Sequence, residues 1–104
     1  MKIIDVKKVK VAPNPHGVDA RNIYDTENAQ IIHIALKPGE SLKRHITLVD
    51  VFFYVLEGRG IVEIGGKEQE VETDMLIESP KGIPHCWHNR GEGNLRILVG
   101  KVPR

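Results

Sequence analysis

Histidine and cysteine side chains are the groups of this chain that could carry chemistry, and the chain has five histidines and one cysteine. Imidazole binds transition metals and transfers protons near neutral pH. His45 stands six residues after the turn sequence Pro38-Gly39, and His85 directly follows the turn-rich segment 80–84. The single Cys86 excludes an intramolecular disulfide and a CxxC zinc site, and we expect it to be a small apolar packing residue.

The two histidine segments resemble the two sequence motifs of the cupin family. The first motif runs Gly…His-x-His…Glu…Gly, and the second runs Gly…Pro-x-Gly…His…Asn. About 15 residues separate the two segments, and the resemblance covers roughly residues 29–102. It implies a double-stranded β-helix, which is a jelly-roll barrel. The motif positions that match are Gly39, His45, Gly58, Pro80, Gly82, His85 and Asn89.

The resemblance also implies a metal site, but with a reduced set of ligands. In metal-binding cupins, the histidines and the glutamate of the two motifs hold one divalent ion inside the barrel. Here Thr47 stands at the second histidine position and Val51 at the glutamate position, and Asp74 replaces the glycine that opens the second motif. What remains is His45 and His85, as ligands for Fe, Mn, Ni, Cu or Zn.

Two further residues are candidates to complete the ligand set. Asp50 is one residue out of phase with the inward positions, so it ligates only if a β-bulge redirects it, and otherwise it is a solvated turn residue. His16 lies in the loop Pro-Asn-Pro-His-Gly. It either closes over the mouth of the barrel as a lid ligand or stays on the surface.

Strand alternation predicts which side chains line the cavity, because successive side chains of a strand point to opposite faces. If His45 points inward, Thr47 does too. In the segment 49–56, Val51 and Phe53 share one face. In the segment 85–89, Trp87 shares the face of His85, where it either lines the cavity or fills the core. We therefore expect a pocket lined by Thr47, Val51, Phe53 and Trp87.

The opposite face of the segment 49–56 is also apolar, through Phe52, Tyr54 and Leu56. A sheet with two apolar faces needs a partner on each, and no helix is expected to cover this one. We therefore expect a homodimer formed by sheet packing. The alternative is that an N-terminal strand covers this face.

Short segments rich in β-branched residues alternate with glycine and proline turns along the whole chain, which predicts an all-β sandwich or barrel without a helix. Gly65-Gly66 between two such segments predicts a hairpin. We expect a single domain, with an N-terminal strand and loop in residues 1–28 and a barrel core in 29–102. The expected strands are 3–11, 29–37, 41–45, 49–56, 61–64, 67–72, 75–78, 85–89 and 95–102.

The length and the net charge of the chain exclude some classes of function. The 104 residues fit one domain, and a net charge of +1 argues against a nucleic-acid binder that relies on bulk charge. No apolar run is long enough to span a membrane and no signal-peptide core is visible, so we expect a cytoplasmic protein. The main hypothesis is a protein that binds a divalent metal, a small polar molecule or both. With a metal bound, it would act as a metal-dependent enzyme on the small molecule. The alternatives are a small-ligand-binding or sensor module without metal, and a purely structural protein.

Overall fold

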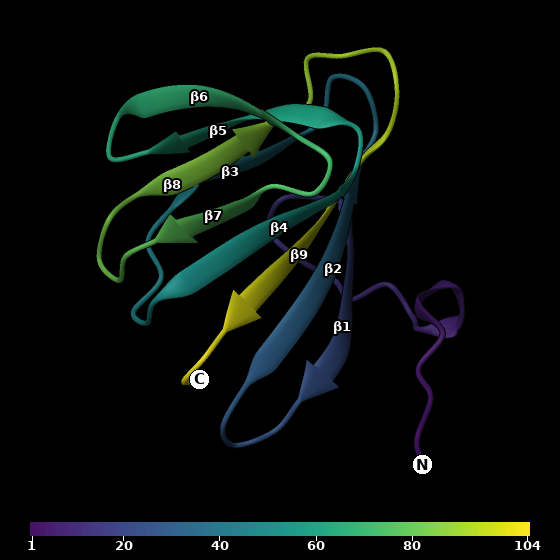
Figure 1. Cartoon of the computed structure of the whole chain (residues 1–104). Helices are drawn as coiled ribbons and strands as arrows, with labels where there is room; N and C mark the ends of the chain where they lie inside the picture. Colours follow the sequence, from purple (N-terminus) through teal and green to yellow (C-terminus); the bar gives the residue numbers. More distant parts are fainter.

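The computed structural model describes residues 1–104 and contains nine strands and one 3-10 turn, Val6–Lys8 (Figure 1). The all-β prediction is therefore confirmed, and the chain has no helix with the length and apolarity to cross a lipid bilayer. The strands are β1 (Asp19–Asp25), β2 (Gln30–Leu36), β3 (Ser41–His45), β4 (Val51–Glu57), β5 (Arg59–Ile64), β6 (Lys67–Glu72), β7 (Leu76–Ser79), β8 (His85–His88) and β9 (Leu95–Lys101).

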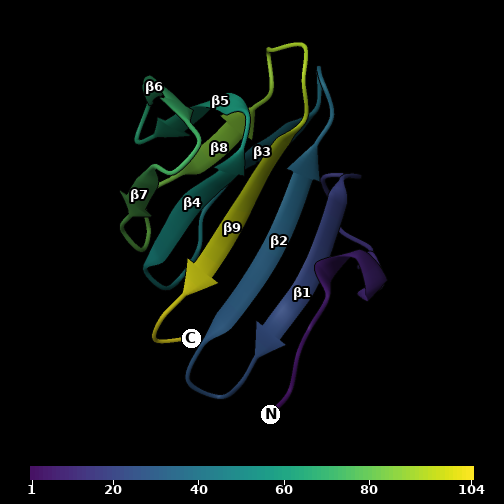
Figure 2. The same cartoon turned by 45° about the vertical axis from the view of Figure 1, so that its right-hand side comes forward.

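The strands form two antiparallel sheets whose inner faces enclose the core. One sheet has the order β1-β2-β9-β4-β7 and the other the order β3-β8-β5-β6 (Figure 2). Most neighbours within a sheet are not consecutive in the chain, so the chain crosses repeatedly between the two sheets. This topology is the double-stranded β-helix. The predicted hairpin is confirmed, since β5 pairs with β6 across Gly65 and Gly66.

The expected N-terminal strand is wrong. Residues 3–11 contain the 3-10 turn, which begins where the Asp5 carboxylate accepts a hydrogen bond from the Lys7 amide at 3.0 Å. The first strand is β1, a segment that the sequence pattern left unassigned. The lysines of 3–11 give this segment no apolar face to bury, whereas β1 pairs along its length with the apolar strand β2. The N-terminal segment lies beside β1 (Figure 2), so it does not cover the outer face of β4.

The predicted alternation of β4 is confirmed. Val51, Phe53 and Val55 are buried on the inner face, and the outer-face residues of the strand are only partly buried. Phe52 lies over Gly100 of the neighbouring strand, where an added Cβ would come within 2.1 Å of the phenyl ring. Glycine at this position thus lets the ring lie flat on the sheet. The homodimer stays a prediction.

The inner faces of β2 and β9 change in character along their length. The register pairs Leu36 with Leu95 at one end, then Ile34 with Ile97 and Ile32 with Val99, and finally Gln30 with Lys101. Leu36, Leu95 and Ile97 are 0% exposed, while Gln30 and Lys101 are only partly buried. The barrel therefore has a closed apolar end and an open end with polar side chains, and the open end holds the site.

Two motif residues hold the closed end together. The buried Asn89 side chain donates hydrogen bonds to the carbonyls of Leu36 at 2.8 Å and Gly93 at 2.9 Å. Gly58 has φ +85°, and an added Cβ would lie 2.3 Å from the Asn94 carbonyl oxygen. Both residues are thus needed to maintain the backbone conformation and not to bind a ligand.

Asp74, which stands where the cupin motif has glycine, adopts the left-handed conformation that glycine would favour, with φ 69°. Aspartate tolerates this region better than most residues. Its carboxylate accepts a hydrogen bond from the Tyr54 hydroxyl at 3.0 Å. Asp74 therefore occupies, in this turn, the left-handed conformation for which the glycine of the motif is suited.

Candidate functional site

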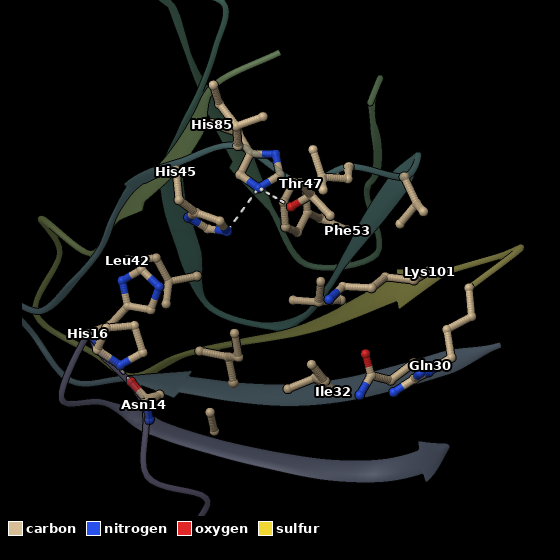
Figure 3. A pocket seen from close by; sticks show the side chains of 18 residues that line it. Asn14, His16, Gln30, Ile32, Leu42, His45, Thr47, Phe53, His85 and Lys101 are labelled. Carbon is tan, nitrogen blue, oxygen red and sulfur yellow. Dashed lines mark hydrogen bonds between the residues drawn. The ribbon is translucent and has the colours of Figure 1, made fainter. Parts of the chain in front are cut away.

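A pocket of about 630 Å³ opens at the polar end of the barrel (Figure 3). Half of its lining residues are hydrophobic, and none is an aspartate or a glutamate. Its volume lies within the range of small-molecule sites. The lining residues are Asn14, Pro15, His16, Ala20, Gln30, Ile32, Ile34, Leu42, His45, Ile46, Thr47, Leu48, Val49, Phe53, His85, Val99, Lys101 and Arg104.

His45 and His85 meet at one wall of this pocket. His45 ends β3 and His85 begins β8, and the two residues are register partners in the antiparallel pair. Their Nε2 atoms are 3.1 Å apart, and their rings are nearly perpendicular, with centroids separated by 4.5 Å. The two motifs, whose histidines are 40 residues apart in the chain, are thus joined by one side-chain contact.

The orientation of the His45 ring fixes where its proton lies. Its Nδ1 is 2.9 Å from the carbonyl oxygen of Lys43, which can only accept a hydrogen bond. Nδ1 therefore carries the proton in the neutral ring, and the lone pair of Nε2 faces His85.

His85 is held more deeply than His45, at 2% exposure. Its Nδ1 lies 2.7 Å from the hydroxyl of Ser79, which is 1% exposed. Burial, followed by the charges of His45 and Lys101, lowers the pKa of His85 to about 4, so the ring is neutral at pH 7. Because a hydroxyl can both donate and accept, Ser79 accommodates either neutral tautomer of this ring.

Thr47 and Phe53 complete the surroundings of the pair. The Thr47 hydroxyl is 3.3 Å from Nε2 of His85. The Phe53 ring meets the His85 ring edge to face, with centroids 5.2 Å apart. Both residues line the pocket, where the alternation argument placed them.

A family comparison agrees with this geometry. Residues 32–100 match the family model of the cupin domain. The chain belongs to the cupin family.

Individual proteins are similar to this chain over different shares of its length. Tetracenomycin polyketide synthase protein TcmJ of Streptomyces glaucescens is 34% identical over 72 residues, which are 68% of this chain but only 48% of TcmJ. Protein MJ1618 of Methanocaldococcus jannaschii is 30% identical over 99% of this chain and 89% of its own length. The crystal structure of TT1209 from Thermus thermophilus is 30% identical, with a TM-score of 0.84 over 100% of this chain and 99% of that one.

His16 reaches the mouth of this cupin barrel, as the lid hypothesis expected. Its ring centroid is 5.1 Å from that of His45. Its Nδ1 accepts a hydrogen bond from the Lys43 amide at 2.9 Å, so in the neutral ring Nε2 carries the proton. Burial, with smaller contributions from His45 and Lys43, lowers the pKa of His16 and favours that neutral form. His16 is thus built as a hydrogen-bond donor and not as a metal ligand.

Three residues expected at the site lie elsewhere. Val51 is buried in the core and does not line the pocket. Trp87 is 0% exposed and packs against Phe53 with centroids 5.4 Å apart, so it fills the core one layer below the pocket. The Asp50 carboxylate accepts a hydrogen bond from the Lys81 amide at 2.9 Å and holds the turn 80–84, away from the two histidines. No bulge redirects it.

The sequence reasoning missed four polar residues of the pocket lining: Gln30, Lys101, Arg104 and Asn14. The signal for the first two was present in the sequence. Gln30 and Lys101 continue the alternating apolar positions of β2 and β9 by one step, which puts them on the inner face. Arg104 lies beyond the last strand, where alternation predicts nothing.

Within the whole chain, no group of three or more histidine, cysteine or acidic side chains is placed to hold a metal ion. The two imidazoles nevertheless fit one. Ligand nitrogens of one zinc-like ion lie about 2.0–2.1 Å from it, which puts neighbouring nitrogens roughly 3 Å apart. The separation of 3.1 Å between the two Nε2 atoms matches this value.

Proposed function

We propose that this cupin binds a divalent metal ion and a small organic molecule next to each other in the open end of the barrel. The observation that carries the proposal is the approach of the two Nε2 atoms to 3.1 Å at the wall of an apolar pocket. The name of TcmJ, which refers to polyketide synthesis, supports a small organic molecule as the binding partner.

The hydrogen bonds behind the histidines suit metal binding. Metal-bound histidines usually donate their second ring N–H to a carbonyl or another acceptor, which orients the ring. Lys43 provides such a carbonyl for His45, and the Ser79 hydroxyl can accept from Nδ1 of His85. Both Nε2 lone pairs would then point at one ion. Two protein ligands leave several coordination positions for water or for the bound molecule.

The residues around the pair would perform the remaining steps. A divalent ion bound there would act as a Lewis acid on an oxygen of the bound molecule. The apolar wall would exclude water from that molecule, and Phe53 would fix the plane of His85. The His16 N–H, at the mouth, would donate a hydrogen bond to the molecule or transfer a proton to it.

A second candidate function is small-molecule binding without metal, and a specific observation favours it. At pH 7 a neutral His85 can donate its Nε2 proton to Nε2 of His45, while Ser79 donates to Nδ1 of His85. Every polar atom of the pair is then satisfied with no ion present. The cupin would act as a carrier or a sensor.

Elemental analysis by mass spectrometry separates the two candidates. Protein purified without chelators and then loaded in turn with Fe(II), Mn(II), Ni(II), Cu(II) and Zn(II) should retain one of these metals near stoichiometrically. His45→Ala and His85→Ala should lose it, and Ser79→Ala should weaken binding by roughly 10–100-fold. His88→Ala is the matched control, because His88 lies on the same strand but outside the pocket.

Two results would reject the metal reading. One is a wild type that retains none of the five metals after gel filtration. The other is metal that both pocket variants retain as well as the His88→Ala control does. Either result would leave the metal-free candidate.

A further inference from the structure

The ionisable side chains that line the pocket are all basic. Its lining contains no aspartate or glutamate, but it contains Lys101 and Arg104 in addition to three histidines. Arg104 is already paired, because its Nε lies 2.9 Å from the Asp25 carboxylate. Lys101 is the cation of this pocket that has no counter-charge.

Lys101 makes none of the seven ion pairs of the structure, and its ammonium makes no hydrogen bond. The residue is partly buried at the end of β9, on the inner face, with Gln30 opposite it on β2 and Val51 opposite it on β4. Figure 3 shows its amino group directed into the pocket. A lysine that only served solubility would extend into solvent.

The wall between Lys101 and the histidine pair is apolar. Val99 is the next inner residue of β9, and it faces Ile32 on one side and Phe53 on the other. A ligand that reaches from the lysine to the histidines must therefore place an apolar body on this wall.

We infer that Lys101 binds the anionic group of a small organic acid whose apolar body lies on Ile32, Phe53 and Val99. This inference rests on the small-molecule role proposed above and specifies the class of molecule: a carboxylate or phenolate that carries its charge at the end remote from His45 and His85. Gln30, beside Lys101, would donate a second hydrogen bond to that anion.

A pair of probes matched in shape tests the inference. 2-Naphthoate and 2-naphthamide share one aromatic body, and only the first is charged. In metal-free protein, titration followed by amide NMR should show both probes shifting the signals of Ile32, Phe53 and Val99. Naphthoate should bind about tenfold more tightly than naphthamide, which corresponds to about 1.4 kcal/mol.

Substitutions that remove a charge test whether Lys101 causes the preference for naphthoate over naphthamide. Lys101→Met should weaken naphthoate about tenfold and leave naphthamide unchanged, whereas Lys101→Arg should keep the preference. Lys67→Met is the matched control: it removes the same charge from the exposed β5–β6 hairpin and should change neither affinity. Raising the salt concentration from about 20 mM to about 1 M should reduce the preference, because added salt screens the charge.

Equal affinity for the two probes in the wild type, or an equal loss for both in Lys101→Met, would overturn the inference and leave the proposed pocket function intact. Binding of neither probe at the pocket would count against both. Because the probes are used without metal, the outcome is independent of whether His45 and His85 bind an ion.

Discussion

The two ends of the barrel interior share strands β2, β8 and β9 but differ in the inner side chains that these strands present. At the closed end, Leu36, Trp87 and Leu95 are fully buried. At the open end the same strands present Gln30, His85 and Lys101. The backbone ladder continues unbroken between them along β2 and β9. A change in the last inner residue of several strands thus gives the barrel a polar pocket, while the remainder of each strand packs into the core.

Because one end is apolar and the other polar, the two ends should contribute differently to the free energy of unfolding. Burial of a large aliphatic side chain contributes about 1.5–3 kcal/mol, whereas a polar side chain at the rim keeps its contact with water and contributes little to folding. Substitutions at the closed end should therefore act on stability, and substitutions at the open end should act on binding.

The sharpest test of this division compares two residues of one strand and one face. Leu36→Ala at the closed end should lower the free energy of unfolding by about 2–5 kcal/mol, since it opens a cavity in the core. Gln30→Ala at the open end should change it by no more than about 0.5 kcal/mol. Urea denaturation of both variants and the wild type provides the measurement. Similar losses in the two variants would mean that the open end also carries the fold.

His85 is the exception to the division, because it belongs to the open end yet is as buried as the core. Its pKa in the folded protein is about 4, below the value near 6.5 expected in the unfolded chain. Between these values the unfolded state binds the extra proton, so stability falls as the pH drops from 6.5 toward 4. For His85 alone, the loss between pH 7 and pH 5 should be about 2 kcal/mol.

The measurement is urea denaturation of the metal-free protein at pH 7 and pH 5, in the wild type and in His85→Gln. The pKa values of His16 and His33 are lowered too, so part of the pH dependence belongs to them. The contribution of His85 is the part that the variant loses. If both proteins lose stability equally between the two pH values, the burial of His85 does not control its protonation.

The sequence predicted the part of this arrangement that depends on regular alternation and on turn residues. Period-two geometry gives the inward direction of Val51 and Phe53 and the shared inward direction of His45 and Thr47, and the turn residues Gly65-Gly66 give the hairpin. Val51 is buried outside the pocket although it lies level with Lys101 at the open end. Trp87, by contrast, lies deeper in the barrel than the pocket, and the sequence of one strand does not encode that depth. For this reason Trp87 could not be separated from Phe53.

Lys101 was missed for a different reason. A lysine at the end of a strand usually extends into solvent, so the alternation of Ile97 and Val99, which places Lys101 on the inner face, was not extended to it. The N-terminal strand was wrongly predicted because β-branched residues at 3–11 outweighed the lysines between them. Local composition predicted extended structure, but the segment has no apolar face to bury against the sheet.

The closed end has one feature that its apolar character does not explain. Trp87 is fully buried and its indole N–H has no hydrogen-bond partner. An unpaired buried donor costs about 1–3 kcal/mol. Trp87→Phe removes that donor, and it also removes part of the ring volume, which costs a fraction of the roughly 3–5 kcal/mol lost when a core tryptophan is cut to alanine. The two effects oppose each other, so the net change should stay below about 1 kcal/mol.

Phe53→Leu is the matched control for this substitution, because Phe53 packs against Trp87 and removing its ring leaves a gap without relieving any polar atom. By urea denaturation, Phe53→Leu should therefore cost more free energy of unfolding than Trp87→Phe, although Trp87 is the larger side chain. A loss above about 3 kcal/mol in Trp87→Phe would show that the indole N–H is satisfied after all, by a buried water molecule. The closed end would then contain a buried water molecule in addition to the buried Asn89, and the contrast between the two ends would be one of degree.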